Sequence, residues 1–150
     1  MGKFNFRLES LLNIVNHREE EAKLKLALCL QELHLEQEAL MKLSKQQTQA
    51  LRTLVESQKG IISIHKLISE HHYCQYLKSE VELKQRDVIV KEKKFEEAQN
   101  VLKEIVKKRK TLEKLKEKRY SDYISDEQNT LQKELDEIAS NSFFTSAGGF

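Results

Sequence analysis

The stretch Glu56-Ser57-Gln58-Lys59-Gly60-Ile61-Ile62 decides the fold, because it holds the one glycine between Gly2 and Gly148 in a chain without proline. Apart from proline, glycine is the least favourable residue in a helix interior, and it tolerates positive φ. A lone glycine among good helix formers therefore predicts a chain reversal near residues 57–62. The alternative is that Gly60 lies inside one continuous helix of roughly 200 Å.

The composition is that of long helices rather than of a globular protein with a thick core. Of the 150 residues, 33% are charged and 39% are hydrophobic, and tryptophan is absent. Such a chain has enough apolar side chains for a seam between two helices but too few for a multilayer core. The sequence accordingly predicts an all-α protein.

Before the glycine, apolar residues recur at alternating spacings of four and three, as they do along a coiled-coil seam. Eleven of fourteen positions are apolar, and the pattern extends well beyond the three or four heptads that indicate a supercoiled helix. The positions are Leu8, Leu12, Val15, Glu19, Ala22, Leu26, Cys29, Leu33, Glu36, Leu40, Leu43, Gln47, Ala50 and Leu54.

A second seam follows the glycine, and the two together predict a long antiparallel two-helix coiled coil. This helical hairpin would occupy residues 1–140. With the turn at Gly60, the polar seam residue Glu36 falls near Lys84 or Lys91, and we expect such pairs to help set the register. The second seam consists of Cys74, Leu77, Val81, Lys84, Val88, Lys91, Phe95, Ala98, Leu102, Ile105, Arg109 and Leu112.

The second helix is expected to be longer than the first, since about 50 residues precede the turn and nearly 80 follow it. Residues from about 117 to 140 would then have no partner within the chain. An unpartnered apolar stripe is typical of a binding surface, and the alternative is a frayed tail. The stripe shifts phase after Leu112 and continues as Tyr120, Ile124, Leu131 and Ile138, flanked by Tyr123 and Leu135.

The last residues, 141–150, are mostly small or polar, and two glycines stand next to the final residue. This composition predicts a disordered tail.

Charge does not favour a nucleic-acid partner. The net charge is only +2, although residues 103–119 carry nine basic side chains against three glutamates. A solvated helix face explains this local excess, and a docking surface for an acidic partner is the alternative. A nucleic-acid site would also need interleaved aromatic residues for base stacking, which this segment lacks.

The sequence predicts neither an enzyme nor a metal or cofactor site. A helical hairpin offers no concave pocket, and no phosphate-binding glycine loop occurs. His71, His72 and Cys74 form the one metal-like cluster, but adjacent histidines point to different faces of a helix. Cys29 and Cys74 both fall on the seam at positions that cannot meet, so they are expected to be buried free thiols.

The location expected from the sequence is the cytoplasm. No apolar run reaches membrane-spanning length, and the N-terminus lacks an apolar signal core.

Two segments near the ends of the chain resemble a known family. Phe4-Asn5-Phe6-Arg7-Leu8-Glu9-Ser10-Leu11-Leu12, followed by Arg18-Glu19-Glu20-Glu21-Ala22, is similar to the opening of the flagellar export protein FliJ. Leu112-Glu113-Lys114-Leu115-Lys116-Glu117-Lys118-Arg119, then Tyr123 and Glu134-Leu135-Asp136-Glu137-Ile138-Ala139, resembles that family's closing segment.

The resemblance implies a non-enzymatic component of the flagellar type III protein export apparatus. Such a protein binds the hexameric export ATPase like the central stalk of a rotary ATPase, promotes its assembly and activity, and links it to the membrane export gate protein. Export chaperones are further expected partners. The location implied is the cytoplasm, with peripheral association to the inner membrane through these partners only.

The resemblance also assigns site residues. The ATPase-binding set would be Phe4, Phe6, Arg7, Leu8, Leu11, Leu12, Arg119, Tyr120, Tyr123, Ile124, Leu131 and Leu135. The gate-binding set would be Leu43, Tyr73 and Leu77, although tip packing also explains the aromatic residues just beyond the turn.

Three other functions remain open at this point. The chain could be a general cytosolic export chaperone or adaptor that holds flagellar substrates or chaperones on its exposed stripe. It could bind nucleic acid through residues 103–119. It could be a structural homodimeric coiled coil in which Gly60 makes no turn.

Overall fold

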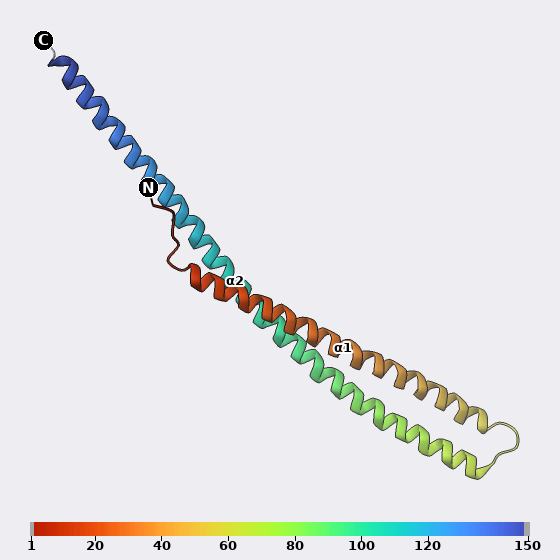
Figure 1. Cartoon of the computed structure of the whole chain (residues 1–150). Helices are drawn as coiled ribbons and strands as arrows, with labels where there is room; N and C mark the ends of the chain where they lie inside the picture. The colour runs from red at the N-terminus through yellow and green to blue at the C-terminus, as the bar shows by residue number, and fades with distance from the viewer. Residues whose placement is uncertain (1, 149–150) are drawn as a thin grey trace. The chain divides into compact units, whose positions relative to one another are not determined.

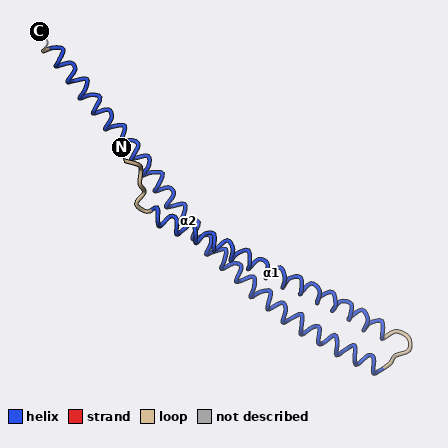
Figure 2. The backbone as a smooth tube through the Cα atoms, viewed as in Figure 1, coloured by secondary structure: helices blue, strands red, loops and turns tan. Residues whose placement is uncertain are grey.

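The computed structural model describes residues 2–148, and over that range the chain forms two long helices. Helix α1 spans Glu9–Ser57 and α2 spans Ile64–Ala147, 49 and 84 residues respectively. A short connection at residues 58–63 joins them, and Figure 2 shows it as a loop, like the segment at the N-terminus. The predicted all-α helical hairpin with a longer second helix is therefore confirmed.

The reversal depends on Gly60, which has a φ of 75°. Helix α1 ends in tightened i→i−3 hydrogen bonds, from the Gln58 amide to the Val55 carbonyl and from the Lys59 amide to the Glu56 carbonyl. The chain then reverses through the left-handed conformation at the glycine. The alternative of one uninterrupted helix is wrong for this chain.

The chain divides into two compact units, which are described separately. The tip unit comprises Glu19–Glu104, and the terminal unit comprises the N-terminal residues through Arg18 together with the chain from Ile105 onward. In the tip unit, α1 and α2 run antiparallel on either side of the loop (Figure 1).

The core of the tip unit is the predicted seam. Leu77 is its most buried side chain, at 2% exposure, and it packs in a cluster with Ala50 and Cys74. Leu43 and Leu54 complete this cluster from α1. Every seam position predicted in this unit is buried or half-buried, so the heptad pattern located the core correctly on both helices.

Charged residues line the seam where apolar ones are missing. The Lys84 Nζ lies 3.0 Å from Glu36 Oε2, which is one of the two pairings predicted for Glu36. Glu32 lies one turn before Glu36 on α1, and its Oε2 is 2.9 Å from the Lys91 Nζ. These hydrogen bonds raise the pKa of Lys84 and of Lys91 and lower that of Glu32. Both pairs join α1 to α2 and fix the antiparallel register.

The terminal unit differs from the sequence prediction in two ways. Residues 2–8, here called the lead, are not helical, yet they pack against Tyr120 and Tyr123 of α2, so the stripe is partnered as far as Tyr123. The expectation that α2 lacks an intrachain partner over residues 117–140 is therefore wrong at Tyr120 and Tyr123, whereas residues 128–140 are all exposed, as expected. The expected disorder from residue 141 differs too, since α2 continues to Ala147; positions 149 and 150 lie outside the described residues.

Replacing Gly60 by alanine should destabilise the hairpin by about 1–2 kcal/mol, because a Cβ at positive φ crowds the neighbouring carbonyl oxygen. No other atom lies within 4 Å of the added Cβ, so the cost comes from the backbone alone. Urea unfolding followed by circular dichroism would measure it. Gly60→Asn is the matched control and should lose clearly less, since asparagine tolerates this conformation. Equal stability of all three proteins would contradict the role assigned to Gly60.

Candidate functional site

An aromatic cluster in the terminal unit holds the lead against α2. Tyr120 and Tyr123 are three residues apart and so share one face of the helix. The Phe4 ring meets the Tyr120 ring edge to face at a centroid distance of 5.2 Å, and it lies 5.5 Å from the Tyr123 ring. Such ring pairs add to the burial of apolar area, so the sequence Phe4-Asn5-Phe6 anchors a segment that has no regular structure.

The Tyr123 hydroxyl adds a polar anchor to the same contact. It lies 2.8 Å from Glu127 Oε1, and it also reaches the carbonyl oxygen of Gly2. A phenol has one hydrogen, so it donates to one of these acceptors at a time. The hydrogen bond to Glu127, with a smaller contribution from desolvation, raises the pKa of Tyr123.

The entry into α1 is fixed by burial and by charge. Phe6 is buried, and its carbonyl accepts from the Glu9 amide at 3.0 Å, where the helix begins. The Glu9 carboxylate lies 2.9 Å from the Lys116 Nζ on α2. Leu12 and Val15, both 5% exposed, continue the apolar contact along the first turns of α1.

An open cavity of about 500 Å³ lies between the lead and α2. It combines aromatic rings with two arginines and two aspartates, so it suits a polypeptide segment of mixed polarity better than a purely apolar ligand. Its lining residues are Phe4, Asn5, Phe6, Arg7, Leu8, Leu115, Arg119, Asp122, Tyr123 and Asp126.

Beyond Glu127, α2 carries apolar side chains that no described residue covers. Leu131, Leu135 and Ile138 are 43%, 58% and 64% exposed and lie at spacings of four and three, on one face of the helix. Phe143 and Phe144 follow, 70% and 68% exposed. This segment, residues 128–147, is called the free segment below.

The structure brings together half of the residues assigned to ATPase binding. Phe4, Phe6, Arg7, Leu8, Arg119 and Tyr123 line the one cavity described above. Tyr120 contacts Phe4, Ile124 is half-buried, and Leu11 is exposed. Leu12 is buried and offers no surface, whereas Leu131 and Leu135 lie in the free segment. That these residues bind an ATPase stays a prediction.

Sequence reasoning missed the acidic residues of this site. Asp122 and Asp126 line the cavity, and Glu127 holds the Tyr123 hydroxyl. The i,i+4 spacing of Tyr123 and Glu127 is a helical hydrogen-bonding pair that could have been found from the sequence.

Of the three residues assigned to gate binding, only Tyr73 offers a surface in the folded hairpin. Leu77 is the most buried residue of the core and Leu43 packs against its cluster, whereas Tyr73 is 50% exposed. Tyr73 lies at a shallow cavity of about 300 Å³ with Gln46, Gln49, Ala50, Thr53 and Glu70. Tyr76, 59% exposed, is a further aromatic residue on this part of α2.

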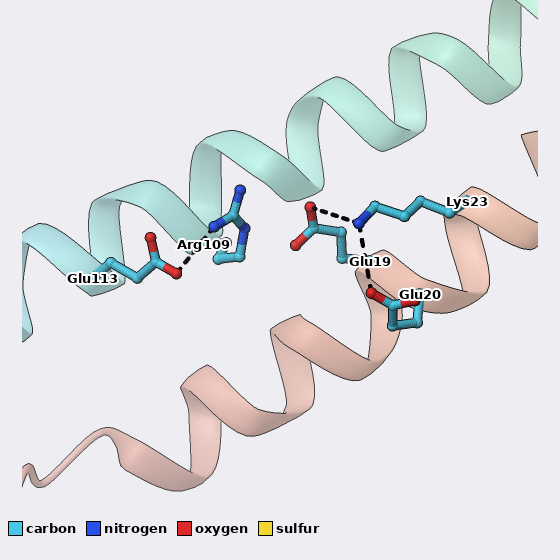
Figure 3. A network of polar contacts seen from close by, with 5 residues as sticks. All are labelled: Glu19, Glu20, Lys23, Arg109 and Glu113. Carbon is cyan, nitrogen blue, oxygen red and sulfur yellow. Dashed lines mark hydrogen bonds and ion pairs between the residues drawn. The ribbon is translucent and has the colours of Figure 1, made fainter.

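Several charged residues form ion pairs with residues three or four positions away on the same helix (Figure 3). The Arg109 guanidinium lies 3.0 Å from Glu113 Oε1 in the terminal unit. In the tip unit, the Lys23 Nζ lies 3.8 Å from Glu19 and 3.5 Å from Glu20. Since Arg109 and Lys116 of the basic segment 103–119 both meet carboxylates, this segment is less available to a polyanion than its composition suggests.

Within residues 2–148, no three His, Cys, Asp or Glu side chains come together as a metal ion would need. Over the same range, neither helix contains a segment long and apolar enough to cross a bilayer. Cys29 and Cys74 are both free thiols.

Comparison with known protein families identifies the chain's family. The protein-family profile described as "Flagellar FliJ protein" matches residues 4–148, nearly the whole chain. No curated protein and no solved structure matches the chain. The resemblance seen at the two ends of the sequence is thereby confirmed.

Tyr123 should deprotonate at a higher pH than free tyrosine, because Glu127 accepts its hydrogen bond. A pKa raised in the folded state stabilises the fold fully below the ordinary value of about 10 and ceases to do so as the pH rises through the raised value. A pH titration of tyrosinate absorbance would measure this. The difference between the unmodified chain and a Tyr123→Phe variant gives the titration of Tyr123 alone. Glu127→Gln should move its titration toward lower pH, and an unchanged titration in that variant would contradict the assignment.

Proposed function

Because this chain belongs to the flagellar FliJ family, whose members are non-catalytic components of the flagellar export apparatus, we propose that it binds the hexameric export ATPase through its terminal unit. It promotes the assembly and activity of that ring, as the central stalk does in a rotary ATPase. It also links the ring to the membrane export gate, so that its association with the inner membrane is peripheral.

The observation that carries this proposal is the unequal length of the two helices. Helix α2 has 84 residues against 49 in α1, and the free segment keeps an apolar face made of Leu131, Leu135 and Ile138. An exposed apolar face on a helix that is already folded needs little ordering on binding, which favours affinity.

The neighbouring cavity extends this surface with charge. Arg7 and Arg119 together with Asp122 and Asp126 offer both signs beside the rings of Phe4 and Tyr123. Interfaces of moderate affinity commonly join an apolar or aromatic centre to a polar rim. The lead, its cavity and the free segment would then form one contact surface within the terminal unit.

A single helical element has no sixfold symmetry, so the subunits of a hexamer must contact it differently. An element that binds one conformation of a subunit better than another shifts that subunit's equilibrium by the difference in binding free energy. Contact with one chain can in this way favour ring assembly and bias the states of individual subunits. This is the mechanism proposed for ATPase stimulation.

Contact with the gate is proposed for the tip unit, through the exposed rings of Tyr73 and Tyr76. These rings provide apolar area with a hydrogen-bonding end, the combination that is enriched at protein interfaces. Leu43 and Leu77 would support this surface from the core rather than touch the partner.

A second candidate function is that of an export chaperone or adaptor. The exposed pair Phe143 and Phe144, whose ring centroids are 6.2 Å apart, favours it because paired rings at a helix end can hold an apolar peptide segment. Copurification of flagellar subunits or chaperones in the absence of the ATPase would support this candidate.

The double substitution Leu131→Ser with Leu135→Ser should weaken ATPase binding by at least about tenfold, since each exposed leucine would lose its burial in the interface. Titration of ATPase stimulation with the purified chain would measure it. Leu24→Ser with Leu28→Ser is the matched control, because these leucines of α1 are 68% and 59% exposed at the same spacing. Equal stimulation by both variants would argue against the free segment as the ATPase contact.

Tyr73→Ala with Tyr76→Ala should weaken binding to the purified gate protein and leave ATPase stimulation unchanged, because the two exposed rings lie in the tip unit. The Leu131 and Leu135 variant serves as the reciprocal control and should keep gate binding. Loss of both activities in the tyrosine variant, with helicity retained, would contradict separate surfaces.

A further inference from the structure

The loop end of the tip unit exposes a group of isoleucines. Ile61 is fully exposed at 102%, and Ile62 and Ile64 are 51% and 69% exposed. All residues from Gln58 to Lys66 are exposed, so these side chains lie at the surface of the loop and of the first turn of α2. This group, Ile61, Ile62 and Ile64, is called the tip isoleucines.

The hairpin itself does not need these side chains. Near the loop, Leu54 and Leu67 are half-buried, and the Ser57 hydroxyl donates to the Glu70 carboxylate of the other helix. The reversal requires only the positive φ at Gly60. Polar residues would serve equally in a loop between helices, so three exposed β-branched apolar residues there call for a binding role.

Basic residues stand nearest to the tip isoleucines in the sequence. Residues 57–66 contain Lys59, Lys66 and no carboxylate, and the nearest acidic residue on α1 is the exposed Glu56. Glu70, the next acidic residue on α2, has a side chain only 16% exposed, and its Oε1 lies 4.0 Å from the Lys66 Nζ, whereas Lys66 is 68% exposed. His65 lies between the isoleucines and Lys66.

We propose that the loop end of the tip unit binds directly to a bilayer containing anionic lipids. The tip isoleucines enter the boundary between headgroups and acyl chains, and Lys59 and Lys66 pair with lipid phosphates. Apolar side chains flanked by lysines are the combination that holds peripheral proteins at this boundary. This contact is independent of the ATPase and gate contacts proposed above.

Two other occupants fit less well. A second copy of the chain at the same loop would bring the Lys59 and Lys66 charges against those of its partner, which is unfavourable. A protein partner would need a pocket for isoleucines that protrude from a loop, whereas a fluid bilayer accommodates them without one.

The affinity expected is low and reversible. Each lysine near an anionic surface contributes about a fivefold gain in binding affinity. The three partly inserted isoleucines contribute further affinity through the burial of their apolar surface. The contact would therefore strengthen the attachment of a chain already held by protein partners, through effective concentration.

The test is flotation of the purified full chain with vesicles of phosphatidylcholine alone and of phosphatidylcholine with phosphatidylglycerol. We expect binding only to the anionic vesicles, weakening as salt rises. Ile61→Ser with Ile62→Ser should abolish it, and Lys59→Gln with Lys66→Gln should reduce it by about twentyfold or more. Leu24→Ser with Leu28→Ser, two exposed leucines elsewhere in the tip unit, should bind as the unmodified chain does.

Absence of binding to anionic vesicles, or binding that survives the isoleucine substitutions, would overturn the proposal. Mass determination in solution gives a further outcome against it: a dimer that the same substitutions dissociate would assign the tip to a second copy. Because ATPase stimulation involves the terminal unit, an unchanged stimulation by the isoleucine variant separates this result from the proposed function.

Discussion

The left-handed backbone at Gly60 is the constraint on which the rest of the molecule depends. With a φ of 75°, this residue allows the chain to turn back within the six residues that separate the two helices. The position of the turn along the sequence fixes which residues of α1 and α2 face each other. It also fixes how much of α2 remains after α1 has ended.

The core of the tip unit could be predicted from the sequence because one physical rule produces it. A repeat of 3.5 residues keeps Leu33, Ala50 and Val88 toward the partner helix, and all three are buried. Glu36 could be assigned in advance to Lys84 or Lys91 for the same reason, since the turn and the heptads restrict the register, and the structure pairs it with Lys84.

The terminal unit could be predicted only in part. The length of α2 and its exposed leucines follow from counting residues, but the packing of the lead does not. Residues 2–8 have no period, so the contact of Phe4 with Tyr120 and Tyr123 depends on side-chain geometry that a pattern does not contain. The same limit applied at Leu77, where an apolar residue beside exposed tyrosines was assigned to a surface although its position belongs to the core.

The cross-hairpin contacts close chain loops of very different size. Ser57 and Glu70 are 13 residues apart, Glu32 and Lys91 are 59 apart, and Gly2 and Tyr123 are 121 apart. Loop-closure entropy grows with this separation, so the contact nearest the turn forms at the lowest entropic cost and each later pair builds on the one before it. During synthesis on a ribosome, α1 is complete before any of α2 exists. As α2 emerges, its residues can pair with α1 in order, beginning next to the loop. The lead packs against α2 last.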